Sequence, residues 1–336
     1  MTTIPVGIVG FRGYSGVELE HLLARHPHVR PFRLEHRQDA EHRPEPLGRD
    51  VPNSIPCTAA AAAQAGIKVV FLATPVEVSI ELTVEFLAAN IRVIDLSGAF
   101  RLGTSENFAR WYKEPHSAPD LLKEAVYGLP EFYRSQIPAA RLVSNPGCYP
   151  TAANLAIRPL IEAGIVNRVA GIVCDAKSGV SGAGRKPSLK TSFCEVSENF
   201  SVYSILNHRH VPEVLMNSNL EESEFSFTAH LLPVNRGILE TIYIKTERVS
   251  SAAEILNIYQ ERYRGERFVR LYAPGSVPDL FSAVRTNFCD IGFQFDAPSR
   301  RLTIVAVIDN LVKGAAGQAI QNMNLMLGFD ESEALL

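Results

Sequence analysis

The feature that most restricts the fold is the N-terminal segment, where a short apolar run ends in glycines and continues into a helical pattern. VGIVGF at 6–11 precedes GVELEHLLARHP at 16–27, in which apolar residues recur at helical spacing. Gly7, Gly10, Gly13 and Gly16 lie three apart. Backbone without Cβ atoms can approach a pyrophosphate at a helix start, although a tight turn without a ligand is the alternative. We expect a strand, a glycine turn and a helix that bind a dinucleotide.

The alternation of strand and helix patterns continues beyond this segment. Buried-strand patterns at 67–75 and 91–97 flank a helical pattern at 77–90. This order is typical of a doubly wound parallel sheet, with loops at the strand ends available for ligands. After Asn145 a helix is followed by several strand patterns rich in β-branched residues. We predict an α/β protein with an N-terminal Rossmann-type doubly wound parallel sheet and an α+β catalytic domain with a mixed or antiparallel sheet.

Length and charge narrow the class of protein. At 336 residues the chain exceeds the usual single core, which favours two domains. Its formal net charge of −3 gives no electrostatic reason to bind nucleic acid or an anionic membrane. Five cysteines without a CxxC pair fit reduced thiols, and the N-terminus lacks the basic start of an export signal. We expect a cytoplasmic protein.

Cys148 stands out among the cysteines because of its context, SNPGCYPT. Asn-Pro-Gly indicates a loop before it, and a helical pattern begins just behind it. A helix N-terminus lowers the pKa of a thiol, which prepares a nucleophile. Cys174 and Cys289 lie in apolar strand patterns and are interpreted as buried packing residues. We favour a nucleophile at Cys148 over a small apolar side chain.

Two histidines in NHRHVPEV are candidates for managing the proton of this thiol. His208 and His210 are expected on extended backbone before Pro212. A metal site is not favoured, because no third ligand with a recognisable spacing accompanies the pair. One of the two is therefore the candidate general acid or base.

The loop SGVSGAGRKPS combines hydroxyl groups, flexible backbone and the cations Arg185 and Lys186. This composition suits an anion such as phosphate, and a flexible surface loop is the alternative. A thiolate, a histidine, an anion loop and a nicotinamide domain together describe the reduction of an acyl phosphate through a thioester to an aldehyde. At the end of the second strand pattern, Arg37 in LEHRQDAEHR favours NADP, whereas a solvated charge cluster is the alternative.

Six motifs then occur in order along the chain: NPGCYPT, DAKSGVSGAGR, HRHVPE, HLLPVNRGIL, NFCDIGF and DNLVKGAAGQAIQNMNLMLG. From Val6 to the C-terminus they resemble the N-acetyl-γ-glutamyl-phosphate reductase family of arginine biosynthesis. The resemblance implies NADPH-dependent reduction of N-acetyl-L-glutamyl 5-phosphate to N-acetyl-L-glutamate 5-semialdehyde and phosphate. It also implies a small-molecule substrate and a homodimer or homotetramer.

The resemblance assigns site residues by position. Cys148 is implied as the nucleophile and His210, in preference to His208, as the acid/base. Substrate-binding residues are implied at Arg209, Glu213, Ser178 and Arg185. The residues expected to bind the cofactor NADP(H) are Gly10, Gly13, Tyr14, Ser15, Gly16, Arg37, Ser181, Gly182 and Asn310, of which Asn310 is implied to hold the nicotinamide. The expected domains are 1–147 with 310–336 for NADP, and 148–309 for catalysis and oligomerisation.

The sequence departs from the family in the glycine loop. Relatives often have Gly-Ala-Ser-Gly-Tyr-Thr-Gly where this chain has GFRGYSG, so that Arg12 either contacts a cofactor phosphate or turns to solvent. Two other functions compete. A reductase of carrier-bound aminoadipyl phosphate from lysine biosynthesis shares the motifs but requires a basic docking face, and no concentrated basic run occurs here. A nucleotide-binding regulator without catalysis would have lost Cys148 or His210, and both are present.

Overall fold

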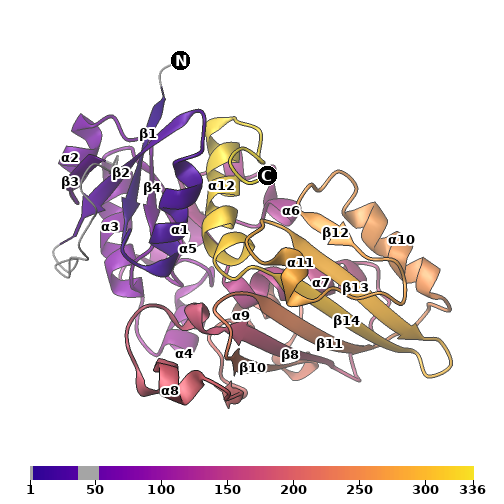
Figure 1. Ribbon diagram of the computed structural model, residues 1–336. Helices are drawn as coiled ribbons and strands as arrows, with labels where there is room; N and C mark the ends of the chain where they lie inside the picture. Colours follow the sequence, from indigo (N-terminus) through magenta and orange to yellow (C-terminus); the bar gives the residue numbers. More distant parts are fainter. Residues whose placement is uncertain (1–2, 37–52) are drawn as a thin grey trace. The chain divides into compact units, whose positions relative to one another are not determined.

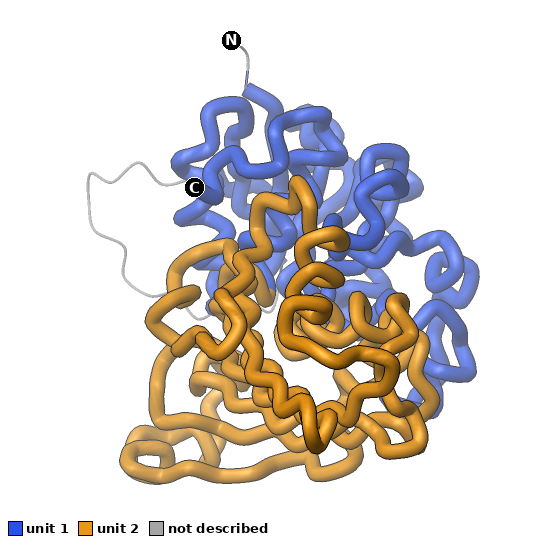
Figure 2. The backbone as a smooth tube through the Cα atoms, turned by 90° about the vertical axis from the view of Figure 1, so that its right-hand side faces the viewer, with its two compact units in different colours: residues 1–146, 315–336 blue, residues 147–314 orange. Residues whose placement is uncertain are grey.

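The structure is a computed structural model that describes residues 3–36 and 53–336. The chain forms two compact units, residues 1–146 with 315–336 and residues 147–314 (Figure 2). The C-terminal segment of the first unit begins at Ala315 rather than at Asn310, the start expected from the sequence. Each unit is built around one sheet.

In the described part of the first unit, a sheet has the strand order β3-β2-β1-β4-β5-β7-β6, and each neighbouring pair is parallel (Figure 1). Its strands are β1 (Ile4–Val9), β2 (Val29–Glu35), β3 (Asn53–Pro56), β4 (Val69–Leu72), β5 (Arg92–Asp95), β6 (Val126–Tyr127) and β7 (Leu142–Ser144). Its helices are α1 (Tyr14–Leu23), α2 (Ala59–Gln64), α3 (Val76–Ala88), α4 (Ser105–Tyr112), α5 (Pro119–Glu124), α6 (Pro130–Tyr133), η1 (Ile137–Ala139) and α12 (Gly317–Leu327). This order confirms the predicted doubly wound sheet.

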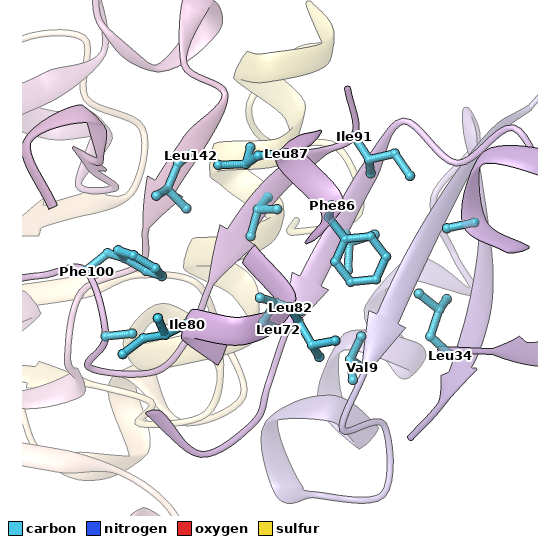
Figure 3. Packing of buried hydrophobic residues seen from close by; sticks show 14 of the residues in the cluster. Val9, Leu34, Leu72, Ile80, Leu82, Phe86, Leu87, Ile91, Phe100 and Leu142 are labelled. Carbon is cyan, nitrogen blue, oxygen red and sulfur yellow. The ribbon is translucent and has the colours of Figure 1, made fainter. Parts of the chain in front are cut away.

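The core of the first unit follows from its apolar runs. All four residues of β4 are buried, as expected for a central parallel strand covered on both faces. Ile80 and Phe86 on α3 pack with Val9 and Leu72 from the sheet (Figure 3). Burying such side chains contributes about 1.5–3 kcal/mol each. The packing therefore fixes the strand ends from which the first unit presents its loops.

In the second unit the sheet order is β12-β13-β14-β11-β8-β10-β9, with parallel β8–β10 and β12–β13 pairs among antiparallel ones (Figure 1). Its strands are β8 (Ile172–Gly179), β9 (Ser201–Tyr203), β10 (Phe225–Leu232), β11 (Ile238–Lys245), β12 (Val269–Leu271), β13 (Cys289–Asp296) and β14 (Arg301–Ile308). Its helices are α7 (Cys148–Glu162), α8 (Phe193–Val196), α9 (Val211–Asn217), α10 (Ala252–Arg262), α11 (Leu280–Ala283), η2 (Val180–Ala183), η3 (Leu189–Thr191) and η4 (Glu222–Glu224). A π-helix, η5 (Val312–Ala316), crosses the boundary between the units. The predicted mixed sheet is confirmed.

Helix α7 is the buried helix of the second unit and packs on β11, β13 and β14. Pro159 lies inside it and cannot donate a hydrogen bond to the carbonyl of Leu155. The hydroxyl of Tyr263 on the turn after α10 donates to that carbonyl instead. Because this hydrogen bond satisfies the carbonyl, α7 continues without a break, and Cys148 is the first residue of an unbroken helix.

The two faces of the second sheet differ in exposure. Cys174 on β8 and Cys289 on β13 are fully buried, which confirms their interpretation as packing residues. On the opposite face, Val173 on β8 and Tyr243 on β11 have exposed fractions of 44% and 46%. The helices therefore cover one face of this sheet, and within the described second unit the other face keeps large apolar side chains exposed.

Candidate active site

Cys148 is the first residue of α7, and Gly147 is its N-cap. No side chain caps this helix end, although the hydroxyl of Thr151 donates to the carbonyl of Gly147 over 2.9 Å. Because the helix dipole and its first amide groups favour negative charge at this end, they stabilise a thiolate on Cys148. The predicted loop-to-helix position of the cysteine is confirmed.

Two side chains of the second unit pack against Gly147. A Cβ atom added there would lie 2.8 Å from Nε2 of His210 and 2.9 Å from Oε1 of Glu213. The other carboxylate oxygen of Glu213 accepts a hydrogen bond of 2.9 Å from the amide of Gly147. Glu213 is fully buried on α9, so it anchors the loop that leads into Cys148. The structure therefore brings His210 and Glu213 to the residue beside the cysteine.

The segment that carries the two histidines is a turn, so the extended backbone expected before Pro212 is wrong. His210 has helical dihedral angles (φ −86°, ψ −12°) and caps α9, and the amide of Val211 donates to the carbonyl of His208 over 3.0 Å. Pro212 lies in the first turn of α9, where a backbone N–H has no partner within the helix, so a proline is tolerated there. The helix can therefore begin before Pro212, and the residues in front of it form a turn instead of extended backbone. The two rings lie 4.9 Å apart, edge to face, and the amide of His210 donates to Nδ1 of His208.

The two histidines differ in their surroundings, and the surroundings of His208 decide whether it can supply a proton. Burial, and to a lesser degree the charge of Arg209, lowers the pKa of His208 to about 4. A histidine with this pKa is neutral at physiological pH and cannot supply a proton there. The ring of His210 supplies two of the three side-chain atoms that would lie nearest to a Cβ atom on Gly147.

A pocket of about 670 Å³ opens beside Cys148 and is lined by residues of the second unit alone. Its walls come from the start of α7, the end of β8, residues 182–183, 188–191 and 201–204, the turn 207–210, and the side chains of Glu195, Asn199 and Leu231. Arg209, Ser178 and Gly182, three residues expected from the sequence, are among the lining residues. Glu213 lies behind Gly147, and Arg185 lies outside the described lining of this pocket.

Two tyrosines in this pocket were not anticipated from the sequence. The hydroxyls of Tyr149 and Tyr203 lie 2.9 Å apart, and Tyr149 also bonds the carbonyl of His230. Burial raises the pKa of Tyr203 to about 12 and that of Tyr149 still further, so both remain protonated donors. Tyr149 adjoins Cys148 in the sequence and could have been noticed. Tyr203 carries no local signal, because the pairing of β9 with β10 brings it there.

The loop after β8 is held by Asn310. Its side-chain oxygen accepts from the amide of Gly237 over 2.7 Å, and its NH₂ group donates to the hydroxyl of Ser181 over 2.9 Å. That hydroxyl in turn donates to the carbonyl of Asn235. Asn310 therefore positions the Ser181–Gly182 turn, and among the described residues the second hydrogen of its NH₂ group makes no side-chain hydrogen bond.

In the first unit, the glycine loop joins β1 to α1. Gly10 has φ +79°, and a Cβ there would lie 2.3 Å from the carbonyl oxygen of Ala73. A Cβ on Gly16 would lie equally close to the carbonyl oxygen of Gly10. Gly13 is the N-cap of α1, and no side chain makes a capping hydrogen bond there. The backbone amides at the helix start, which includes Tyr14 and Ser15, are therefore left for a ligand. Tight glycine packing and an uncapped helix start fit a dinucleotide pyrophosphate. Arg37 lies outside the described residues.

Comparison with known proteins identifies the chain. Residues 5–140 match the family model described as semialdehyde dehydrogenase, NAD binding domain, and residues 148–310 match the semialdehyde dehydrogenase dimerisation domain. The N-acetyl-gamma-glutamyl-phosphate reductase of Symbiobacterium thermophilum is 46% identical, with 99% of this chain and 98% of the relative covered. The enzyme of that name from Geobacillus sp. (strain WCH70) is 43% identical over 98% of each chain. The chain belongs to the N-acetyl-γ-glutamyl-phosphate reductase family.

Membership in this reductase family confirms the predicted resemblance, the oxidoreductase class and the nicotinamide-binding domain. Among solved structures, aspartate semialdehyde dehydrogenase II of Vibrio cholerae matches with a TM-score of 0.72 at 18% identity, covering 98% of this chain and 99% of that one. At this identity the match supports the fold, which agrees with the predicted fold class. In the described residues of this reductase family member, no helix has both the length and the apolar character to cross a membrane.

Proposed function

We propose that this chain reduces N-acetyl-L-glutamyl 5-phosphate to N-acetyl-L-glutamate 5-semialdehyde and phosphate, with NADPH as the cofactor, in arginine biosynthesis. The observation that carries the proposal is the packing of His210 and Glu213 on Gly147, immediately before a cysteine at a helix start. This arrangement places a nucleophile, a proton carrier and an anchoring carboxylate around one loop. The relatives at 46% and 43% identity carry the name of this reaction.

The Cys148 thiolate attacks the acyl carbon of the substrate, the carbon–oxygen bond to phosphate breaks, and a thioester remains on the sulfur. When bound, NADPH supplies the hydride that reduces this thioester. His210 protonates the substrate oxygen that becomes negative and takes the proton back as the carbon–sulfur bond breaks. The aldehyde leaves and the thiolate is regenerated. General acid catalysis by a positioned imidazole contributes typically 10²- to 10⁴-fold to such a step.

His210 is favoured over His208 for two reasons. It contacts Gly147, and the low pKa of His208, about 4, leaves that ring neutral at physiological pH. Glu213 positions the Cys148 loop through the Gly147 amide. Arg209 on the pocket wall provides a cation for an anionic group of the substrate.

The remaining site residues are divided between the substrate and the cofactor. Ser178 at the pocket and Arg185 on the loop after it are proposed to serve the substrate phosphate. Residues proposed to hold NADPH are Gly10, Gly13, Tyr14, Ser15 and Gly16 in the first unit, and Ser181, Gly182 and Asn310 in the second. The position of the nicotinamide at Asn310 is compatible with the spare amide hydrogen of that side chain.

The proposed enzyme acts in the cytoplasm as a homodimer or homotetramer. The match to a dimerisation domain over residues 148–310 supports self-association. Exposed Val173 and Tyr243 on one face of the second sheet offer apolar surface for it.

The test is the reverse reaction, in which N-acetylglutamate semialdehyde, phosphate and NADP produce NADPH that is followed by absorbance. We expect a phosphate-dependent signal from the native chain and a loss of at least about 10³-fold in Cys148→Ser. Cys194→Ser is the matched control, because Cys194 is an exposed cysteine of the same unit and should leave the rate unchanged. Full activity in Cys148→Ser would exclude the thioester.

Inactivity of the native chain would contradict the proposed substrate. The same assay with aminoadipate semialdehyde on its carrier protein then tests the lysine-pathway alternative. If both substrates fail while NADPH still binds, the chain acts as a nucleotide-binding regulator.

A further inference from the structure

A glycine of the second unit packs directly against the proposed nucleophile. Gly314 lies in the π-helix η5, and a Cβ atom added to it would lie 2.8 Å from Cβ and 3.3 Å from Cα of Cys148. Rotation about χ1 moves neither of these two atoms, so Cys148 could only make room by a shift of its backbone. The backbone of Gly314 is therefore a support that fixes the first residue of α7.

The turn that carries Gly314 has an uncommon hydrogen-bond register. The amide of Gly314 donates over 2.9 Å to the carbonyl of Asp309, five residues back, which is the bond of a π-helix. Such turns are rare and frequently occur at functional sites. The side chain of Lys313 is fully buried, with its Nζ atom 5.6 Å from the ring centre of Phe268. Residues 309–314, the π turn, are thus held within the second unit by a backbone bond and by a buried side chain.

The carboxylate of Asp309 anchors the π turn at its first residue. Asp309 is fully buried, and its Oδ1 atom accepts hydrogen bonds of 2.7 and 3.1 Å from the amides of Leu311 and Val312. Its Oδ2 atom accepts a hydrogen bond of 2.7 Å from the amide of Arg285 and lies 3.2 Å from Nε of Arg236. Hydrogen bonds to a charged acceptor are roughly twice as strong as those between neutral groups. One carboxylate therefore fixes the π turn to two other segments of the second unit.

We propose that Asp309 and Gly314 are positioning residues for Cys148. Asp309 holds the π turn in place, and Gly314 lets that turn approach the first residue of α7 closely enough to fix it. The inference rests on the proposed function, in which Cys148 is the nucleophile, and adds the groups that set its position. The same turn carries Asn310, which holds the hydroxyl of Ser181, so one anchor serves both the cysteine and the loop at the pocket.

The first variant, Gly314→Ala, adds one atom at the contact with Cys148. An ordinary contact begins at 3.4 Å, so Cys148 must move by about 0.6 Å. We expect kcat of the reverse reaction to fall about 10- to 100-fold. KM for the semialdehyde should stay within about twofold, because Gly314 is not among the residues that line the pocket.

A second readout needs neither substrate nor cofactor. The rate at which iodoacetamide alkylates Cys148 at pH 7, followed by mass spectrometry, reports the sulfur as a nucleophile. In Gly314→Ala we expect this rate to fall about 3- to 10-fold, because a displaced sulfur loses part of its stabilisation by the helix start. The exposed Cys194 of the same unit is the internal reference, and its rate should not change. Gly265→Ala is the matched variant, since a Cβ atom there would meet no atom within 4 Å, and it should leave both readouts unchanged.

Asp309→Asn removes the charge of the anchor while keeping its size. The new NH₂ group cannot accept a hydrogen bond from a backbone amide, so we expect the π turn to loosen, and kcat and the alkylation rate to fall as in Gly314→Ala. Asp290→Asn is the matched control, because Asp290 is equally buried in the same unit and is bonded by both ends of the Arg270 guanidinium, at 2.6 and 2.8 Å. This control should lower the urea midpoint of unfolding and leave both readouts unchanged.

An equal fall in both readouts for Asp290→Asn and Asp309→Asn would overturn the inference, since it would indicate a general loss of stability. Native kcat in Gly314→Ala would also overturn it. If Asp309→Asn does not fold, Gly314→Ala decides alone, because it leaves the carboxylate in place. An inactive native chain would refute the proposed function, whereas the alkylation rates, which need no substrate, would still decide whether the π turn positions Cys148.

Discussion

Gly147 offers the sharpest test of the active-site geometry, through Gly147→Ala. Its backbone (φ −65°, ψ 151°) suits alanine, so the substitution carries no conformational penalty. The new Cβ, however, would lie 2.8 Å from Nε2 of His210 and 2.9 Å from Oε1 of Glu213. An ordinary contact begins at 3.4 Å, so the His210 ring must move by about 0.6 Å.

A displacement of this size has consequences for rate and for stability. Misplacing a reacting group by 1 Å can cost about 100-fold in rate, so we expect kcat to fall between about 10- and 100-fold. Overpacking of this kind destabilises a protein by about 1–3 kcal/mol. The assay is kcat for the reverse reaction, with urea unfolding measured on the same preparation.

Gly164→Ala is the control, just after the end of the same helix. Gly164 has φ +67°, and a Cβ atom added there would meet no atom within 4 Å. Alanine there costs about 1–2 kcal/mol through its left-handed backbone and touches no catalytic residue. Gly147→Ala with native kcat, or an equal fall in kcat in both variants, would refute the contact between Gly147 and His210 as a catalytic constraint.

Two predictions concern titration. Because the pKa of His208 is about 4, this ring does not titrate between pH 5 and 8, and another group sets the acid limb of the kcat/KM profile. His208→Gln should therefore leave the shape of that profile unchanged. Loss of the acid limb in this variant would contradict the prediction. Burial raises the pKa of Glu240 well above its ordinary value, so the folded chain keeps a proton that the unfolded chain releases above about pH 4.3, and the free energy of unfolding should fall as pH rises beyond that value. Urea unfolding at pH 5.5 and 7.5 should show this slope in the native chain and a smaller one in Glu240→Gln; equal slopes would refute it.

Local sequence was sufficient for much of the fold and for the position of Cys148. The apolar run of β4 and the glycine turn before α1 depend on residues close together in the chain. The same holds for Cys148, because Asn-Pro-Gly ends a loop and α7 begins directly after it. Features of this kind follow from propensity and periodicity alone.

The side chains around Cys148 are brought there by tertiary structure, so local sequence patterns did not predict their arrangement. The turn at His208–His210 replaces the expected extended backbone, because α9 begins directly before Pro212. Tyr203 reaches the pocket through the pairing of β9 with β10, and Glu213 meets Gly147 across a long sequence separation. No local pattern encodes such contacts, so only the resemblance to a family pointed to Glu213, and nothing pointed to Tyr203.

The division of the chain has a consequence for the order of events during synthesis. The second unit is one continuous segment, 147–314, and can complete its contacts as soon as that segment has emerged. The first unit is closed only by residues 315–336, where Asn322 donates to the carbonyl of Gly128 and to the side chain of Asn145. The N-terminal sheet must therefore wait, with its apolar surface incompletely covered, for the last part of the polypeptide to leave the ribosome. Truncation at the C-terminus should for this reason destabilise the N-terminal unit before the catalytic one.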